Sequence, residues 1–115
     1  MKFMSNENLN PLEVQTKKFN SFNEFYPFYL SEHSQKGTRV VHFIGTLFAI
    51  VSLLRAAVVG DPRIFIVGVL FTYLLLWISH LTIEKNKPAT FKYPVYSFLG
   101  DLKMFYELLR GKLKF

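Results

Sequence analysis

Residues 77–94 read Trp77-Ile78-Ser79-His80-Leu81-Thr82-Ile83-Glu84-Lys85-Asn86-Lys87-Pro88-Ala89-Thr90-Phe91-Lys92-Tyr93-Pro94, and this stretch decides the fold. It begins as the end of an apolar helix and then turns polar. His80 and Glu84 lie four residues apart, so on a helix they share one face. An imidazole and a carboxylate placed in this way can hold one metal ion or one proton. Pro88 is expected to stop the helix, because the residue before a proline is pushed out of the helical region.

Two long apolar stretches precede this polar segment. Residues 40–59 carry no charge before Arg55, and residues 64–83 carry none at all. Each is about as long as the roughly 20 residues that span the hydrocarbon layer of a bilayer. The connection Gly60-Asp61-Pro62-Arg63 is short, so the two stretches predict an antiparallel transmembrane hairpin. A soluble bundle with two buried helices is the alternative.

Composition and charge bound the class of protein. The chain has 115 residues, a formal net charge of +6 and no cysteine, which excludes thiol chemistry. Of its 14 Lys and Arg residues only Arg55 and Arg63 lie near the turn of the hairpin. The positive-inside rule then predicts that both termini are cytoplasmic, at the inner membrane of a bacterium or the endoplasmic reticulum of a eukaryote. The apolar hairpin makes nucleic acid an improbable partner, and the oligomeric state is left open.

We therefore expect an all-α integral membrane helical bundle, in which amphipathic helices flank the transmembrane hairpin. Residues 1–18 are expected to form a flexible arm and residues 19–115 a single helical membrane domain. An aromatic-rich helix is expected between residues 20 and 33, capped by Ser21 and kinked or divided by Pro27. Thr38 can cap the next helix. A last helix is expected over residues 95–113, with one apolar stripe made by Phe98, Leu99, Leu102, Phe105, Tyr106, Leu109 and Leu113.

The three histidines of the chain are His33, His42 and His80. In an antiparallel hairpin, residues equidistant from the turn lie at the same depth. Positions 42 and 80 are equidistant from Asp61, so His42 and His80 should lie side by side, about 28 Å from the turn at 1.5 Å per residue. His33 can fold back to the same point across the Gly-containing connector. Gly45 and Gly68 are expected to allow close helix contact.

These residues predict a metal site at the cytoplasmic edge of the apolar layer. The expected ligands are His33, His42, His80 and Glu84, because imidazole suits iron, zinc, copper and nickel, and an added carboxylate favours iron or manganese over copper. Three further possibilities stay open: histidines that only satisfy each other and the backbone in a non-catalytic membrane or lipid-interacting protein, or a zinc site that hydrolyses a lipid ester, or a shared proton.

Basic and polar residues flank the predicted site. Arg39 lies one turn before His42, and Lys85, Asn86 and Lys87 follow Glu84. We expect these four residues to bind the carboxylate of a fatty acid or the phosphate of a lipid. A solvated basic rim is the alternative.

Several segments together resemble the 2-hydroxy-fatty-acid dioxygenase family of α-oxidation. They are Phe28-Tyr29-Leu30-Ser31-Glu32-His33, Arg39-Val40-Val41-His42-Phe43-Ile44-Gly45-Thr46, Trp77-Ile78-Ser79-His80, the run from Glu84-Lys85-Asn86-Lys87-Pro88 to Tyr93-Pro94, and Gly100-Asp101. The resemblance covers roughly residues 20–114, and residues 84–93 are its most specific part. Lys87 stands where the family pattern leads us to expect Arg, and Ser79 where it leads us to expect Gly.

The resemblance implies an integral membrane enzyme that depends on Fe(II) and uses O2 to shorten a 2-hydroxy fatty acid by one carbon. Eukaryotic members act in phytosphingosine degradation. By position, His33, His42 and His80 match the family's iron-binding histidines, and Glu84 matches the acidic residue that follows them. These four residues are accordingly the expected catalytic set.

Overall fold

The computed structural model describes residues 19–115, which form four α-helices and two short helical turns, with no strand in that range. In chain order these are α2 (Phe22–Ser31), α3 (Lys36–Val59), α4 (Pro62–Ser79), the π-helical turn η2 (His80–Glu84), the 3₁₀ turn η3 (Ala89–Phe91) and α5 (Pro94–Leu109). The predicted all-α class is confirmed. The arm predicted for residues 1–18 lies outside the described residues.

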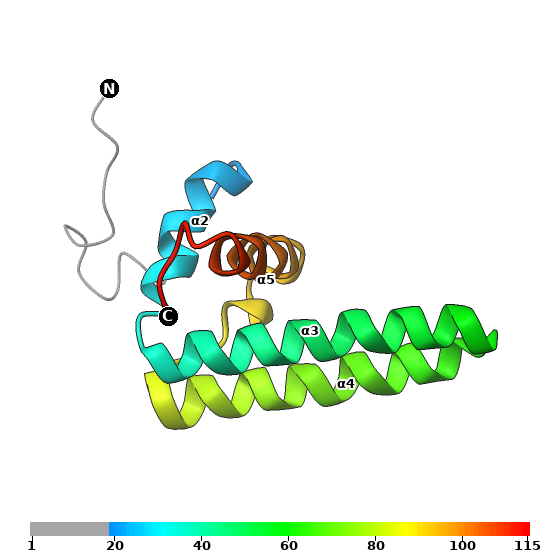
Figure 1. Ribbon diagram of the computed structural model, residues 1–115. Helices are drawn as coiled ribbons and strands as arrows, with labels where there is room; N and C mark the ends of the chain where they lie inside the picture. Colours follow the sequence, from blue (N-terminus) through cyan, green and yellow to red (C-terminus); the bar gives the residue numbers. More distant parts are fainter. Residues whose placement is uncertain (1–18) are drawn as a thin grey trace.

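The helices α3 and α4 form the predicted hairpin and run side by side along its length (Figure 1). Gly60 ends α3 in the left-handed conformation at φ 79°, which glycine adopts without strain. Asp61 caps α4, because its side chain accepts a hydrogen bond from the backbone N–H of Arg63 at 3.1 Å. Pro62 then occupies the first turn of α4, where its missing N–H costs nothing.

The seam between the two long helices is made of small and polar side chains. The buried residues are Thr38, His42, Gly45, Thr46, Ser52 and Ala56 on α3, and Gly68, Thr72, Leu76 and Ser79 on α4. A Cβ atom on Gly68 would lie 2.3 Å from Ser52 Oγ, so only glycine permits this approach. The close helix contact predicted for Gly45 and Gly68 is therefore confirmed.

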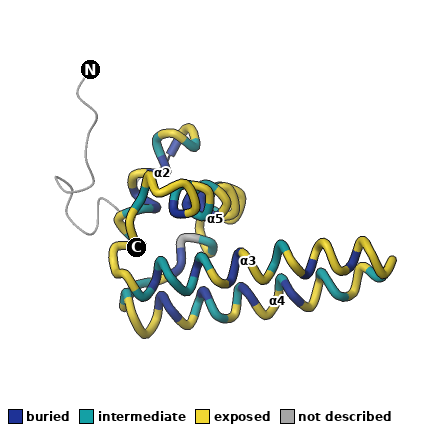
Figure 2. The backbone as a smooth tube through the Cα atoms, in the orientation of Figure 1, coloured by how far each residue is buried: buried dark blue, intermediate teal, exposed yellow. Residues whose placement is uncertain are grey.

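Large apolar side chains of the hairpin point outward instead. Leu54, Val58, Val67 and Leu70 are all at least 60% exposed, and yellow, exposed backbone dominates the end of the hairpin with the turn (Figure 2). By length and composition, the helical stretches Lys36–Val59 and Pro62–Glu84 could each cross a membrane. Only 22% and 28% of their most apolar segments is buried within the protein, so the hairpin is not the core of a bundle.

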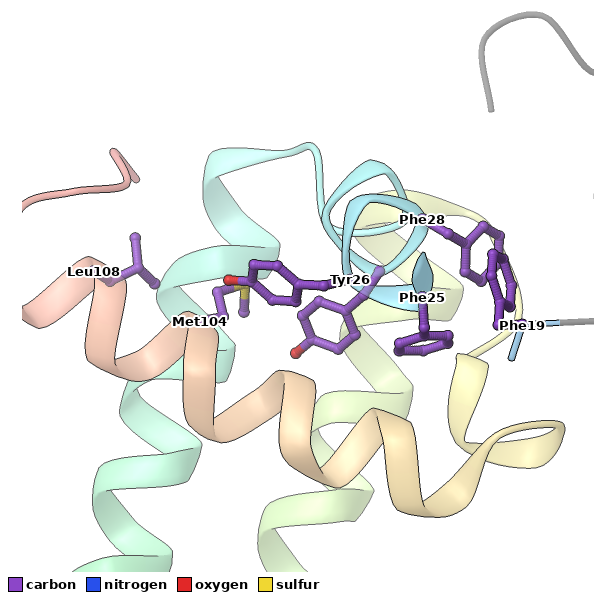
Figure 3. Close-up of a cluster of buried hydrophobic side chains, with 7 residues drawn as sticks. Phe19, Phe25, Tyr26, Phe28, Met104 and Leu108 are labelled. Carbon is purple, nitrogen blue, oxygen red and sulfur yellow. The ribbon is translucent and has the colours of Figure 1, made fainter. Parts of the chain in front are cut away.

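The core lies at the other end, between α2 and α5. Phe19, Phe25, Tyr26, Phe28, Tyr29, Met104 and Leu108 form one buried cluster, most of which is labelled in Figure 3. Ser21 caps α2 as predicted, accepting a hydrogen bond from Glu24 N at 3.2 Å. α2 continues through Pro27 and is not divided there.

The face that α5 buries differs from the predicted stripe. Its buried residues are Ser97, Gly100, Asp101, Met104 and Leu108, whereas most of the predicted apolar stripe is exposed, for example Phe98 at 51% and Leu109 at 64%. α5 packs against α2 through the face that carries Gly100 and Met104, because the ring of Tyr29 fits beside Gly100. It contacts α3 through Phe105, whose ring stacks on that of Phe43.

Two helix ends also differ from the prediction. α3 begins at Lys36 with Gln35 as its cap residue, so Thr38 lies inside the first turn and does not cap it. The acceptor at the beginning of α3 is instead the carboxylate of Glu84, at the end of η2, which accepts a hydrogen bond from Gln35 N. The last helix ends at Leu109, not near residue 113, because Gly111 turns left-handed at φ 74° and Lys112 N donates back to Glu107 O.

Gly100→Ala tests the packing of α5 on α2. Its new Cβ would lie 2.7 Å from Cδ2 of Tyr29, so we expect an overpacking cost of about 1–3 kcal/mol that exceeds the helix-propensity gain of up to about 1 kcal/mol. The measurement is the apparent melting temperature in detergent by circular dichroism. Gly37→Ala is the matched control, because its Cβ would meet only the flexible tip of Ile83 at 3.3 Å. A Gly100→Ala protein as stable as the control would contradict this packing.

Candidate metal centre

Three histidine side chains converge at the end of the hairpin opposite its turn. His33 Nε2 lies 3.0 Å from His42 Nε2 and 2.9 Å from His80 Nε2. The rings of His42 and His80 lie side by side, with centroids 5.1 Å apart, as their equal distance from the turn predicted. The three ring planes are nearly perpendicular in every pair, at 84° to 90°. All three side chains are buried.

The second nitrogen of each ring fixes its orientation and tautomer. His33 Nδ1 lies 2.6 Å from Tyr29 O, and His42 Nδ1 lies 2.9 Å from Thr38 O. A carbonyl oxygen only accepts hydrogen bonds, so both Nδ1 atoms carry the proton and donate. The contact of His80 Nδ1 is with Asn86 Oδ1, at 2.7 Å.

Asn86 is itself oriented by α2. Its Nδ2 donates to Glu32 O at 3.1 Å and to Glu32 Oε2 at 2.8 Å, which leaves Oδ1 as the acceptor that faces His80. His80 Nδ1 is therefore the donor in that contact as well. All three neutral imidazoles hold their protons on Nδ1, and three Nε2 lone pairs point at one another.

Such an arrangement is suited to a shared cation. A proton on one Nε2 would make that ring positive, and burial together with the neighbouring His42 and His80 holds the pKa of His33 well below its usual value. A metal ion fits better, because Nδ1-protonated imidazoles with an oriented second nitrogen are typical metal ligands. Histidine nitrogens bind such ions at about 2.0–2.1 Å, which sets ligand atoms about 3–3.5 Å apart. Among the described residues, His33, His42 and His80 form a group that could hold a metal ion.

The π-helical turn η2 brings His80 and Asn86 into place. It runs from His80 to Glu84 and ends at Lys85, which adopts the left-handed conformation at φ 60°. The chain reverses there, before Pro88, and Asn86 N donates to His80 O at 3.0 Å. A π turn adds a residue to a helical turn, and such turns are frequent at functional sites.

Glu84 is not among the residues that the structure brings together around the Nε2 atoms. Its carboxylate accepts hydrogen bonds from Gln35 N at 2.6 Å and from Ser34 Oγ at 3.0 Å. It thus binds the beginning of α3 to the end of η2, where a negative charge is favourable beside free helix N–H groups. Its role as a ligand stays a prediction.

The predicted substrate-binding residues surround the site without lining the two cavities described below. Arg39 Nε donates to His33 O at 2.8 Å and its Nη1 donates to Lys114 O at 2.6 Å, so it holds the backbone of a histidine. Asn86 orients His80, and Lys85 and Lys87 are exposed. The binding of a substrate by these four residues stays a prediction.

The histidines line a small cavity, and a larger cavity lies next to it. A small one of about 10 Å³ is lined by Tyr29, the three histidines, Leu76, Trp77, Thr90, Ser97 and Asp101. A larger one of about 250 Å³ lies between α3, α4 and α5 and is almost wholly apolar. Leu76 and Asp101 line both, so the two cavities are neighbours.

Asp101 stands at their junction as a buried carboxyl group. Tyr29 OH donates to its Oδ1, and Tyr73 OH donates to its Oδ2 at 3.2 Å. Burial raises the pKa of Asp101 to about 7, although these two hydrogen bonds act in the opposite direction. The ring of Tyr29 also stacks on His33, with centroids 4.0 Å apart. The interpretation of the sequence assigned no role to Asp101, Tyr29, Trp77 or Ser97. Asp101 lies outside the apolar stripe that was predicted to be buried, so its burial had no signal in the sequence.

The fold and the site define the class of protein: an apolar helical hairpin that carries a buried three-histidine cluster suited to a metal ion. The chain belongs to the Mpo1-like family, whose description is 2-hydroxy-palmitic acid dioxygenase Mpo1-like and whose model matches residues 19–113. The resemblance found in the sequence is thereby confirmed. Comparison with curated proteins and with solved structures gave no significant match.

His42→Ala and His80→Ala should each abolish stoichiometric metal binding while the helices stay formed, because each removes one of three converging nitrogens. Elemental analysis of protein purified without a chelating tag measures this, with circular dichroism as the folding control. Asn86→Ala should weaken metal affinity by about 10–100-fold, as expected when the partner of a ligating imidazole is lost.

Glu84→Gln decides the role of that carboxylate. A loss of metal equal to that of the histidine variants would identify a fourth ligand, and retained metal would leave Glu84 as an anchor of α3. Stoichiometric metal in both histidine variants would defeat the assignment of the whole centre.

Proposed function

We propose that this protein is an Fe(II)-dependent dioxygenase that shortens 2-hydroxy fatty acids by one carbon at a membrane. The observation that carries the proposal is the convergence of three Nδ1-protonated histidines on a small cavity that neighbours a larger apolar one, in a chain whose family is described as a 2-hydroxy-palmitic acid dioxygenase. His33, His42 and His80 would hold the iron, which leaves open positions on a six-coordinate ion.

The proposed reaction is balanced with O2 as the only co-reactant: R–CH(OH)–COOH + O2 gives R–COOH, CO2 and H2O. Carbon 2 rises from the alcohol to the carboxyl level, carbon 1 leaves as CO2, and O2 accepts the four electrons. Bound iron would supply the redox centre that makes O2 react with a closed-shell substrate.

The residues of the chain would place the substrate and keep water out. The almost wholly apolar cavity of about 250 Å³ would take the part of the acyl chain nearest the reacting carbons, and the rest would lie along the exposed apolar face of the hairpin. Tyr29 and Tyr73 donate hydrogen bonds to Asp101 and so join α2, α4 and α5 at the part of that cavity lined by Asp101 and Tyr73. Asn86 and the two carbonyl oxygens hold the histidine protons on Nδ1.

The positions of the apolar side chains support a membrane location. Small and polar residues fill the seam of the hairpin, and large apolar residues cover its outside, as in helices that pack within lipid. The exposed apolar stripe of α5 extends this apolar surface at the end of the hairpin opposite its turn. An amphipathic helix of this kind suits the membrane interface. Of the 14 Lys and Arg residues only Arg55 and Arg63 lie near the turn of the hairpin, so both termini would be cytoplasmic.

Oxygen uptake with a 2-hydroxy fatty acid tests the activity. We expect the Fe(II)-loaded protein to consume one O2 for each 2-hydroxyhexadecanoic acid and to form pentadecanoic acid, identified by mass spectrometry. His42→Ala should consume none, because it cannot hold the ion. Hexadecanoic acid, which lacks the hydroxyl group, is the control substrate and should give no uptake.

Other results would assign another function. Tight zinc in the purified protein with release of fatty acid from a lipid ester would favour a hydrolase. Absence of both metal and turnover would leave a non-catalytic membrane protein with structural histidines.

The membrane topology can be tested with single cysteines, because the natural chain has none. Arg63→Cys at the turn should react with a membrane-impermeant maleimide added outside intact cells, whereas Lys112→Cys should react only after the membrane is opened. Equal labelling of both positions from outside would contradict the proposed orientation.

A further inference from the structure

Two buried polar groups near the histidines lack a hydrogen-bond partner. In the part of the chain that the structure describes, three buried side-chain atoms are unpaired: Thr38 Oγ1, Trp77 Nε1 and Ser97 Oγ. Folded proteins pair nearly all such atoms, so each exception calls for an explanation. Two of the three belong to residues that line the same small cavity, the one beside His33, His42 and His80.

The two groups come from different helices and meet only at this cavity. Trp77 is on α4, three residues before His80, and Ser97 is on the buried face of α5 with 2% of its surface exposed. The cavity measures about 10 Å³, about the room that one water-sized group needs. One oxygen atom of a ligand therefore fits beside Trp77, Ser97 and the histidines.

The chemistry of the two groups defines what that oxygen must do. The indole Nε1–H only donates, and a serine hydroxyl without a partner can donate as well. Both are therefore satisfied by an oxygen acceptor, and a carboxylate oxygen accepts two such bonds with the gain of charge assistance.

The surroundings define what is attached to that oxygen. Leu76 and Asp101 line both the small cavity and the apolar cavity of about 250 Å³, so a polar head held in the first continues naturally into a chain held in the second. An amphiphile with one acidic head and one apolar chain matches this pair of cavities.

We infer that Trp77 and Ser97 bind a carboxylate oxygen of the fatty-acid substrate and so place its first two carbons beside the histidine cluster. The inference deepens the proposed function and rests on it for the chemical class of the ligand. Trp77 and Ser97 are then substrate-binding residues in addition to the basic residues that the sequence indicated.

The chain offers a direct probe, because Trp77 is its single tryptophan. Metal-free protein in detergent is titrated with 2-hydroxyhexadecanoic acid while the tryptophan emission is recorded. We expect a saturable change in emission, since the ligand accepts a hydrogen bond from the indole itself. Isothermal titration on the same samples measures binding independently of the fluorescence.

Ser97→Ala should weaken binding about tenfold or more, the usual effect of losing one hydrogen bond to a charged group, and should raise KM similarly with little change in kcat. Its apparent melting temperature should be equal to or above that of the natural protein, because the hydroxyl has no partner to lose. A merely structural serine would show the reverse pattern, with lower stability and unchanged affinity.

Ser52→Ala is the matched control. Ser52 is a buried serine in the hairpin seam, where it packs on Gly68. It lines neither the small cavity nor the apolar cavity next to it. Its replacement should leave the affinity for 2-hydroxyhexadecanoic acid unchanged. Trp77→Phe, assayed by oxygen uptake, gives a second and independent test through a raised KM.

The outcomes separate this inference from the proposed function. Normal oxidation of 2-hydroxyhexadecanoic acid with unchanged Trp77 emission, and wild-type affinity in Ser97→Ala, would overturn the inference alone and leave a resident water as the partner of both groups. A saturable emission change that Ser97→Ala weakens, without any oxygen uptake by the iron-loaded protein, would support the head-group site and overturn the dioxygenase. Absence of binding by titration calorimetry would overturn the inference whatever the activity.

Discussion

The rest of the structure depends on the contact between the Nε2 atoms of His33, His42 and His80, whose lone pairs point at one another. Each is directed by a donor bond on the opposite side of its ring, to Tyr29 O, Thr38 O or Asn86 Oδ1. Those partners lie in α2, in the first turn of α3 and in the segment after η2. The end of the hairpin opposite its turn is therefore held together by the same hydrogen bonds that orient the histidines for a cation.

The distribution of polarity is reversed from that of a water-soluble domain. Serine, threonine, histidine and glycine fill the contact between α3 and α4, and leucine, valine and isoleucine cover the outside. Only the cluster between α2 and α5 has the ordinary arrangement of buried aromatic and aliphatic side chains. One chain thus combines a part suited to lipid with a part suited to water, and the histidines lie where the two meet.

The sequence predicted the features that follow from the spacing of residues along the chain. The equal distances of His42 and His80 from the turn predicted their adjacency, and the run of apolar residues predicted the hairpin. Prediction from the sequence failed where a residue distant in the chain determines how a helix is capped or packed. The cap of α3 comes from Glu84 rather than from Thr38, and α5 buries the face that carries Gly100 rather than the predicted apolar stripe because Tyr29 fills the space beside that glycine. Trp77 and Ser97 are 20 positions apart, and nothing local signals that they share a cavity.

The symmetry of the two arms about Asp61 limits how such a chain can change in length. Losing one residue from a single arm would turn one histidine about 100° away from the other and slide it by about 1.5 Å. Losing about seven residues, nearly two full turns, from each arm would leave both rings level and facing as before. The length of the hairpin can therefore change in steps of two turns while the histidine cluster stays intact, so that hairpin length is separable from the chemistry of the site.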